Sequence, residues 1–277
     1  MPRCWRHFMR LSRGLYLENM MKFDSSRAWK EATAAISANR EVVFALAGVF
    51  FLLPGLAIAL LFPSPEPTAG MDNEAAMAMV SEYYGTILPF VIPMVLFQAA
   101  GTLALLTLLT DRTGPTVGEA IRMGVKSILP YFLAQIVLGL GVGLIGGLVL
   151  AVGMATGSQA MTAIGGTIVF MLLIYAMVKT SLVAPVIAVE GERNPIAALR
   201  RSWRLVSGNT ARIAVFYLLV LAVFLVVMLV ATSVVGIVVA LLAGAEAVEL
   251  AGAVVSSAIN AVLALYMVAI IAATHRQ

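Results

Sequence analysis

The chain has 277 residues, of which 61% are hydrophobic and only 12% are charged. Soluble domains carry about 25% charged residues, so this composition is too apolar to cover the surface of a soluble protein. Apolar stretches recur along the chain, and a helix of about 20 apolar residues spans a bilayer. The sequence therefore predicts an all-α polytopic membrane protein.

The N-terminal segment, residues 1–21, is basic, but no apolar stretch follows it directly, so it makes a poor signal peptide. We interpret this segment as either a disordered basic tail or a misassigned start, with translation beginning at Met20 or Met21. Beyond it, residues 22–273 are predicted to form one six-helix membrane domain, and residues 274–277 a cytoplasmic tail.

Six apolar blocks follow, each long enough to cross a membrane. They cover residues 42–62, 86–109, 128–152, 164–189, 212–243 and 250–273. The fifth block is longer than one crossing needs, which predicts a tilt or a bend, with Gly236 as the expected bend. Pro89 and Pro93 should bend the second span, because each proline removes a backbone hydrogen bond.

Lys and Arg gather on one side of the predicted membrane. With the N-terminus in the cytoplasm, the cytoplasmic segments contain seventeen of these bases and the opposite loops contain none. The opposite loops, residues 63–85, 153–163 and 244–249, contain six acidic residues instead. This distribution follows the positive-inside rule, so both termini are predicted to be cytoplasmic.

Residues 192–209 have the pattern of a short amphipathic helix in the headgroup layer. Asn194 suits the N-cap, Pro195 the first turn and Gly208 the C-terminal stop. The side chains predicted to contact anionic lipid headgroups are Arg200, Arg201, Trp203 and Arg204. The alternative is that the arginines only enforce topology and the helix only caps the bundle.

Residues 24–40 and 113–127 repeat this combination of an N-cap, an apolar stripe and basic residues. Each of the three segments precedes a pair of spans. The chain therefore reads as three pseudo-repeats of an interfacial helix, a span, an outer loop and a returning span. Their bounds are residues 22–110, 111–189 and 190–273, and such long-period similarity is typical of a duplicated architecture.

Lys179 is the one charged residue inside a predicted span rather than at its edge. A charge in the membrane is costly and marks a candidate functional residue, but this ammonium could also snorkel to the cytoplasmic surface. The neutral polar residues of other spans could supply its partners, or could form hydrogen bonds between helices. They are Gln98, Gln135 and Asn260.

The third span carries a ridge of glycines spaced four residues apart, Gly139, Gly143 and Gly147. Such a GxxxGxxxG ridge lets a second helix approach closely, so it predicts tight helix packing. The packed helix could belong to this chain or to another copy of it, which leaves a homo-oligomer as one of two outcomes.

The sequence lacks the groups that catalysis or metal binding would need. Both histidines, His7 and His275, lie at the termini, Cys4 is the single cysteine, and the acidic residues lie outside the spans. Hydrolytic chemistry needs an acid, a base or a metal-bound water within hydrogen-bond reach. We therefore predict that the protein is not an enzyme, with no catalytic residues, metal, cofactor or nucleic-acid partner.

One segment resembles a known family. Residues 184–209, APVIAVEGERNPIAALRRSWRLVSGN, are similar to the signature of the membrane domain found in some glycerophosphoryl diester phosphodiesterases and of the related YciC-like bacterial inner-membrane proteins. The matching residues are Pro185, Glu190, Gly191, Ala198, Ser202, Trp203 and Gly208. The resemblance covers most of the chain and implies a helical protein of a bacterial inner membrane. It implies no phosphodiesterase activity, which belongs to a separate hydrolase domain that this chain has no room for.

These features favour a non-enzymatic inner-membrane protein that engages anionic lipid or organises the envelope. The alternative is a small-solute or lipid transporter with Lys179 in its pathway, because charged residues in spans often line such pathways. The bilayer and its anionic lipids are the expected partners. The sequence does not name a substrate or a protein partner.

Overall fold

The computed structural model describes residues 23–63, 65, 70–110 and 114–277. Within that part of the chain, six helical segments are long and apolar enough to cross a membrane: Arg40–Leu61, Asn73–Thr110, Val117–Ala155, Gln159–Ala188, Thr210–Ala243 and Ala247–His275. The predicted all-α class and number of spans are therefore confirmed. The prediction for residues 1–21 lies outside the described residues, and the domain bounds stay a prediction.

The helices follow one another with short connections. They are α2 (Ser25–Ala38), α3 (Arg40–Ala47), the π-helical turn η1 (Gly48–Leu52), α4 (Leu53–Leu61), α5 (Asn73–Thr110), α6 (Val117–Ala155), α7 (Gln159–Thr180), α8 (Val183–Ala188), α9 (Pro195–Val206), α10 (Thr210–Ala243) and α11 (Ala245–His275). The segments α3, η1 and α4 together form the first span, and α7 with α8 forms the fourth.

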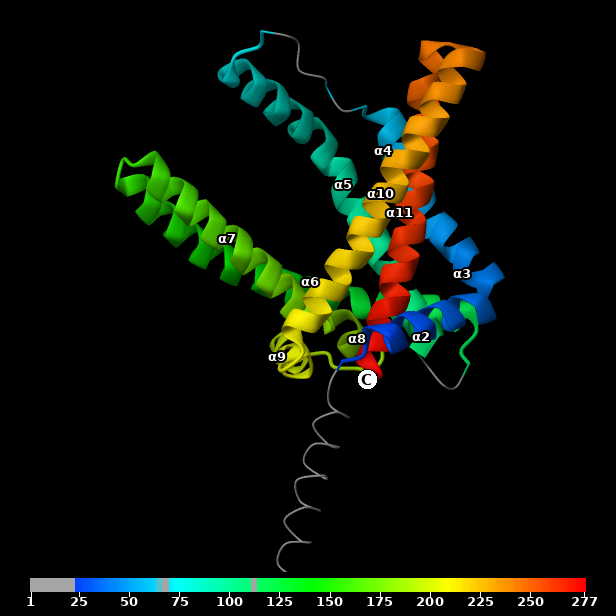
Figure 1. Cartoon of the computed structure of the whole chain (residues 1–277). Helices are drawn as coiled ribbons and strands as arrows, with labels where there is room; N and C mark the ends of the chain where they lie inside the picture. Colours follow the sequence, from blue (N-terminus) through cyan, green and yellow to red (C-terminus); the bar gives the residue numbers. More distant parts are fainter. Residues whose placement is uncertain (1–22, 64, 66–69, 111–113) are drawn as a thin grey trace, which may run out of the picture.

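The spans diverge from a shared base (Figure 1). The α6–α7 hairpin leans away from the α10–α11 hairpin, and the N-terminal half of α5 leaves the base separately from both. Helices α2, α8 and α9 and the C-terminus lie at the base, and the α6–α7 and α10–α11 turns lie at the far ends. The described parts of the segments predicted to be cytoplasmic therefore share one end of the molecule.

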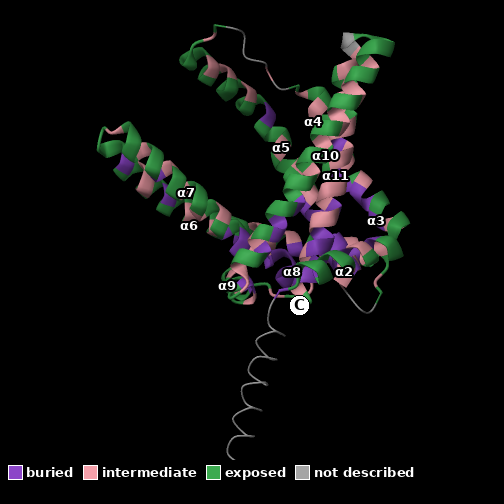
Figure 2. Cartoon of the chain, in the orientation of Figure 1, coloured by how far each residue is buried: buried purple, intermediate pink, exposed green. Residues whose placement is uncertain are grey.

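Burial follows the same division (Figure 2). Buried residues gather at the base, whereas the outer parts of the spans are mostly exposed. Leu103 and Leu106 of α5 and Leu265 of α11 are fully buried there, in one cluster that includes residues of α2 and α10. Apolar side chains such as Leu144 and Leu242 stay exposed on the outer spans. Helices of this length with apolar outer surfaces fit contact with lipid.

Two of the three predicted amphipathic segments form separate helices, α2 and α9. The third continues into its span, because α6 begins at Val117 and runs unbroken to Ala155. Thr116 caps that helix through a capping box: its hydroxyl accepts from the Glu119 backbone N–H, and the Glu119 carboxylate accepts from the Thr116 backbone N–H. The helix continues through Pro130, so the interfacial turn and the span are one helix.

The residues expected to bend the second and fifth spans lie inside unbroken helices. Pro89 and Pro93 lie within α5, which continues through both. Helix α10 likewise runs through Gly236 without interruption. A Cβ atom placed on Gly236 would lie 3.8 Å from the Val248 side chain of α11, so this glycine lies in a helix contact. The fifth span is thus one continuous helix at this position, and its tilt or bend stays a prediction.

The glycine ridge of the third span does not pack against the described residues of this chain. A Cβ placed on any ridge glycine would have no neighbour within 4 Å; these residues are Gly139, Gly143 and Gly147. Gly146 and Gly153 pack against α7 instead, where an added Cβ would lie 3.2 Å from the Val169 side chain and 3.1 Å from the Met161 carbonyl oxygen, respectively. Within this chain, α6 therefore packs against α7 through a different face from the predicted glycine ridge. Packing of the ridge against a second copy stays a prediction.

Candidate lipid-contact site

Helix α9 begins and ends where its sequence predicts. The Asn194 side chain accepts hydrogen bonds from the backbone N–H groups of Ile196 and Ala197 at 3.0 and 3.2 Å, which caps the first turn. Pro195 occupies the first helical position, where its missing N–H is not needed. Gly208 has a φ of 89°, a conformation that glycine adopts without strain, and the chain turns there into α10.

A buried serine fixes α9 against the end of α7. The Ser202 hydroxyl donates to the Lys179 carbonyl oxygen at 2.9 Å and accepts from the Leu182 backbone N–H at 3.2 Å. These two backbone groups lie where α7 ends, so the serine satisfies polar groups that would otherwise be unpaired. Ala198 and Val206 lie one turn to either side and are also buried. Helix α9 is therefore held firmly at the base.

Lys179 is 4% exposed and points toward α9 rather than into the middle of the bundle. Its Nζ donates to the Ser207 hydroxyl at 3.0 Å. The ammonium also lies 5.2 Å from the ring centroid of Trp203 and 5.6 Å from that of Tyr175, within the range of cation–π attraction. The charge is thus held at the base end of its span by neighbouring side chains.

The partners proposed for Lys179 from the sequence are not the ones observed. Among the described residues, no hydrogen bond joins this lysine to Gln98, Gln135 or Asn260. Gln135 instead donates through Nε2 to the Tyr131 hydroxyl at 2.8 Å, one turn away on α6. Sequence spacing identified polar residues in spans, but Ser207 follows the end of α9 and lies in no span.

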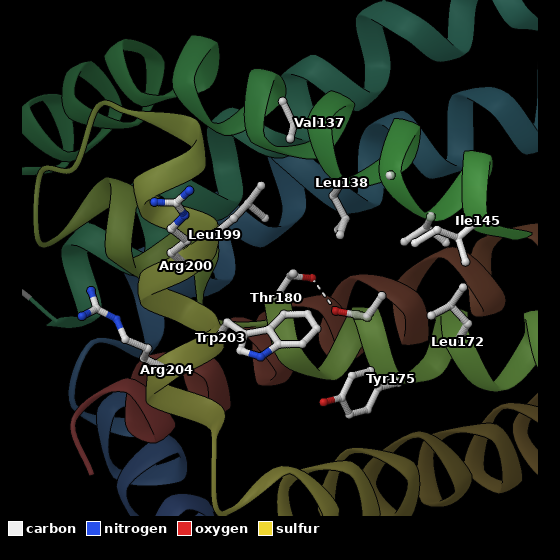
Figure 3. A pocket seen from close by; sticks show the side chains of 13 residues that line it. Val137, Leu138, Ile145, Leu172, Tyr175, Thr180, Leu199, Arg200, Trp203 and Arg204 are labelled. Atoms are coloured by element: carbon white, nitrogen blue, oxygen red, sulfur yellow. Dashed lines mark hydrogen bonds between the residues drawn. The ribbon is translucent and has the colours of Figure 1, made fainter.

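An apolar groove of about 770 Å³ runs between α6 and α7 and is closed at the base end by α9 (Figure 3). Its walls come from α6 and α7, and its closed end from α9. The lining residues are Val137, Leu138, Gly141, Val142, Ile145, Leu172, Tyr175, Ala176, Thr180, Leu199, Arg200, Trp203 and Arg204. The Trp203 ring meets the Tyr175 ring edge-on, with centroids 5.5 Å apart, and Lys179 supports both rings.

Two arginines stand at the base end of this groove. Figure 3 shows the guanidinium groups of Arg200 and Arg204 on the side of α9 turned away from the apolar walls. In the part of the chain that the structure describes, no carboxylate lies within ion-pair distance of either group. The site therefore joins an apolar groove to two arginines that form no ion pair with a described carboxylate. Such an arrangement suits an amphiphile with an anionic head.

Arg201 lies apart from this pair. Its Nε lies 3.1 Å from a carboxylate oxygen of Glu190, and the other oxygen of that carboxylate lies 2.9 Å from His275 Nε2. Burial would raise the pKa of the Glu190 carboxyl, but hydrogen bonds and charge from Arg201 and His275 outweigh burial and lower it. Of the four residues predicted to contact headgroups, three line the groove and Arg201 ties α9 to the C-terminus.

The groove walls and the Glu190 cluster were not predicted from the sequence. Tyr175 lies one turn before Lys179, and a tyrosine beside a buried lysine was the one available signal. Gly141 and Leu172 look like any other residues of an apolar span. Among the described residues, no three His, Cys, Asp or Glu side chains could together hold a metal ion.

The fold and the site define a polytopic membrane protein with an amphipathic groove at the base of its spans. The chain belongs to the family described as Domain of unknown function (DUF7847), which matches residues 30–277. This match does not test the resemblance to the phosphodiesterase membrane-domain family, which stays a prediction. No curated protein and no solved structure matches the chain.

Proposed function

We propose that this protein is a non-enzymatic integral protein of the bacterial cytoplasmic membrane that binds anionic lipid at its cytoplasmic face. The observation that supports this most is the placement of Arg200 and Arg204, which no described carboxylate pairs, at the base end of the apolar groove. The positive-inside distribution of Lys and Arg supports a cytoplasmic position for the base. Trp203 is 42% exposed, and an amphipathic ring at this level fits the headgroup layer.

The expected strength follows from the number of available charges. A base near an anionic leaflet contributes about 1 kcal/mol. Arg201 adds little, because Glu190 already neutralises it. Arg200 and Arg204 should therefore contribute about 2 kcal/mol in all, which is roughly a thirtyfold effect on binding.

Contacts between elements support the three pseudo-repeats as part of this proposal. Each interfacial segment contacts the returning span of the unit before it, and the first unit follows the third when the three are arranged in a ring. The contacts are α9 with α7, α2 with α11, and the start of α6 with α5. In two of the three places a tryptophan meets a tyrosine. Trp203 lies 5.5 Å from Tyr175, and Trp29 stacks on Tyr266 with centroids 5.5 Å apart.

The position of Lys179 favours lipid binding over the transporter alternative. A lysine in a transport pathway should face the water-filled or solute-filled part of a bundle. Lys179 is instead 4% exposed, bonded to Ser207 and covered by two aromatic rings at the base. This environment fits a residue that positions Trp203 in the groove.

The proposal can be tested in lipid nanodiscs made with and without phosphatidylglycerol. Anionic lipid should stabilise the wild-type protein against thermal unfolding, and Arg200→Gln/Arg204→Gln should reduce that extra stability by about 2 kcal/mol. The control is Glu190→Gln/Arg201→Gln, which removes an ion pair without a change in net charge. If anionic discs give no more stability than neutral discs to the wild type and to both variants, the proposed function is wrong.

A further inference from the structure

We propose that the α6–α7–α9 groove holds one phospholipid molecule in a defined pose. Its phosphate lies between Arg200 and Arg204, and one acyl chain lies along the groove past Leu138 toward Ile145 and Leu172. This inference rests on the proposed function. It goes beyond a general preference for anionic lipid, because it assigns one lipid molecule to one site on each chain.

The shape of the groove supports an acyl chain. Beyond α9 the walls consist of aliphatic side chains of α6 on one side and, apart from Tyr175 and Thr180, of α7 on the other (Figure 3). Gly141 lies in the α6 wall, and a Cβ placed on it would meet no atom within 4 Å, so the missing side chain leaves room there. The hydroxyl of Thr180 is turned to its own helix, where it donates to the Ala176 carbonyl oxygen at 2.7 Å. The interior is therefore suited to a hydrocarbon chain.

The charges select the head of the ligand. A guanidinium donates through a planar fork that matches phosphate oxygens, and two of them lie one helical turn apart on α9. A free inorganic phosphate would leave the apolar walls uncovered, and a neutral amphiphile would leave both arginines without an anion. A membrane-embedded phosphodiester with acyl chains matches both parts of the site. Lys179 takes no part in binding the head, since Ser207 and the two rings hold its ammonium.

The test fills the groove without touching the charges. Gly141→Leu puts a side chain into the α6 wall, and the matched control is Gly143→Leu on the same helix, outside the groove and also with open space. Each protein, purified with its native lipid in a mild detergent, is examined by native mass spectrometry. Wild type and Gly143→Leu should retain one phospholipid per chain. Gly141→Leu should retain on the order of tenfold less, because a hydrophobic pocket discriminates by at least that factor for one methylene.

A second measurement locates the chain. A phosphatidylglycerol carrying a photoreactive group in its acyl chain should crosslink to peptides of α6 and α7 that include Val137 and Leu172. Val137→Trp provides an independent block of the same wall if Gly141→Leu does not fold, and folding is checked by the melting temperature. Glycerol phosphate without acyl chains should not protect the protein from heat.

The outcomes separate this inference from the proposed function. Equal lipid retention and crosslinking in wild type and Gly141→Leu would overturn the defined site. So would protection by glycerol phosphate as strong as that by the lipid, since it would show a head-only anion site. If the wild type still gains stability from anionic nanodiscs in either case, the proposed function stands while the defined site fails. Loss of that gain in the wild type would overturn both.

Discussion

Lys179 illustrates how a single buried charge is accommodated near a membrane surface. Among the described residues, the ammonium has one hydrogen bond, to Ser207, and lies near two aromatic rings, those of Trp203 and Tyr175. A double-mutant cycle isolates the hydrogen bond. Ser207→Ala should cost about 1–2 kcal/mol of stability in the wild type, since it removes a partner from a charged donor. In the Lys179→Met background the same change should cost much less.

The measurement is thermal or chemical unfolding of the four proteins of this cycle in one detergent. Equal costs of Ser207→Ala in the two backgrounds would show that the hydroxyl does not stabilise the ammonium. The transporter alternative would then regain support, particularly if Lys179→Met also kept wild-type stability. Lys179→Arg is the conservative control, because it keeps the charge next to both rings.

The Glu190 cluster predicts a pH dependence with a definite sign. The folded-state pKa of this carboxyl lies below its ordinary value of 4.5. Folding therefore favours the carboxylate, and the stabilisation is complete above the unfolded-state value and is lost as the pH falls through the folded-state value. Glu190→Gln should thus lower the melting temperature at pH 7, and its difference from wild type should shrink below pH 4.5. A difference that stays constant from pH 7 down to about pH 3 would contradict this assignment.

At the residue scale, the sequence predicted which residues carry charge near the site but not how those charges pair. Arg200, Arg201 and Arg204 look equivalent on a helical wheel. The difference comes from the C-terminus and from Glu190, which fold back beside Arg201 only in the tertiary structure. Local caps were readable because they depend on neighbours within four residues, as Asn194 shows.

At the scale of elements, helix α6 contains some glycines that pack against a neighbouring helix and others that, among the described residues, contact none. A Cβ placed on Gly124 would lie 2.9 Å from backbone atoms of Ala100 and Ala104 on α5, whereas Gly143 faces open space. Gly124→Leu should therefore force the two helices apart and cost about 1–3 kcal/mol or more, as overpacked sites do. Gly143→Leu should leave the melting temperature in detergent unchanged.

The mass of the protein–detergent complex gives a second readout for this pair. If a second copy packs on the ridge of Gly139, Gly143 and Gly147, Gly143→Leu should convert an oligomer to a monomer while the chain stays folded. An unchanged mass would show that the ridge faces lipid. A Gly124→Leu protein as stable as the wild type would contradict the observed α5–α6 contact.

Element prediction succeeded where one physical requirement dominates. A chain crossing the bilayer must satisfy its backbone within a helix of sufficient length, so hydropathy counted the spans correctly. It could not choose a face of α6, because glycines recur on several faces of that helix and spacing alone does not say which face meets a partner. It also missed that residues 113–127 continue into the third span, since both parts are good helix formers.

At the scale of the whole molecule, the firm base and the diverging outer spans suggest where lipid can enter. Buried residues concentrate at the base, and the α6–α7 hairpin leaves it with most of its outer surface exposed (Figure 2). The groove lies along that hairpin, so a lipid could reach it from the bilayer without opening the bundle. The apolar walls would then lie in the membrane while Arg200 and Arg204 stay at its surface.

The orientation of this base is the last prediction. Seventeen Lys and Arg residues lie in the segments assigned to the cytoplasm, and the described parts of those segments share one end of the structure. Alkaline phosphatase, which is active only outside the cytoplasm, should be active when fused after residue 72, 158 or 246. It should be inactive when fused after residue 118, 200 or 277, with protein levels checked by immunoblot. High activity after residue 200 would place α9 on the outer side, and the arginines would then face a different leaflet from the one proposed.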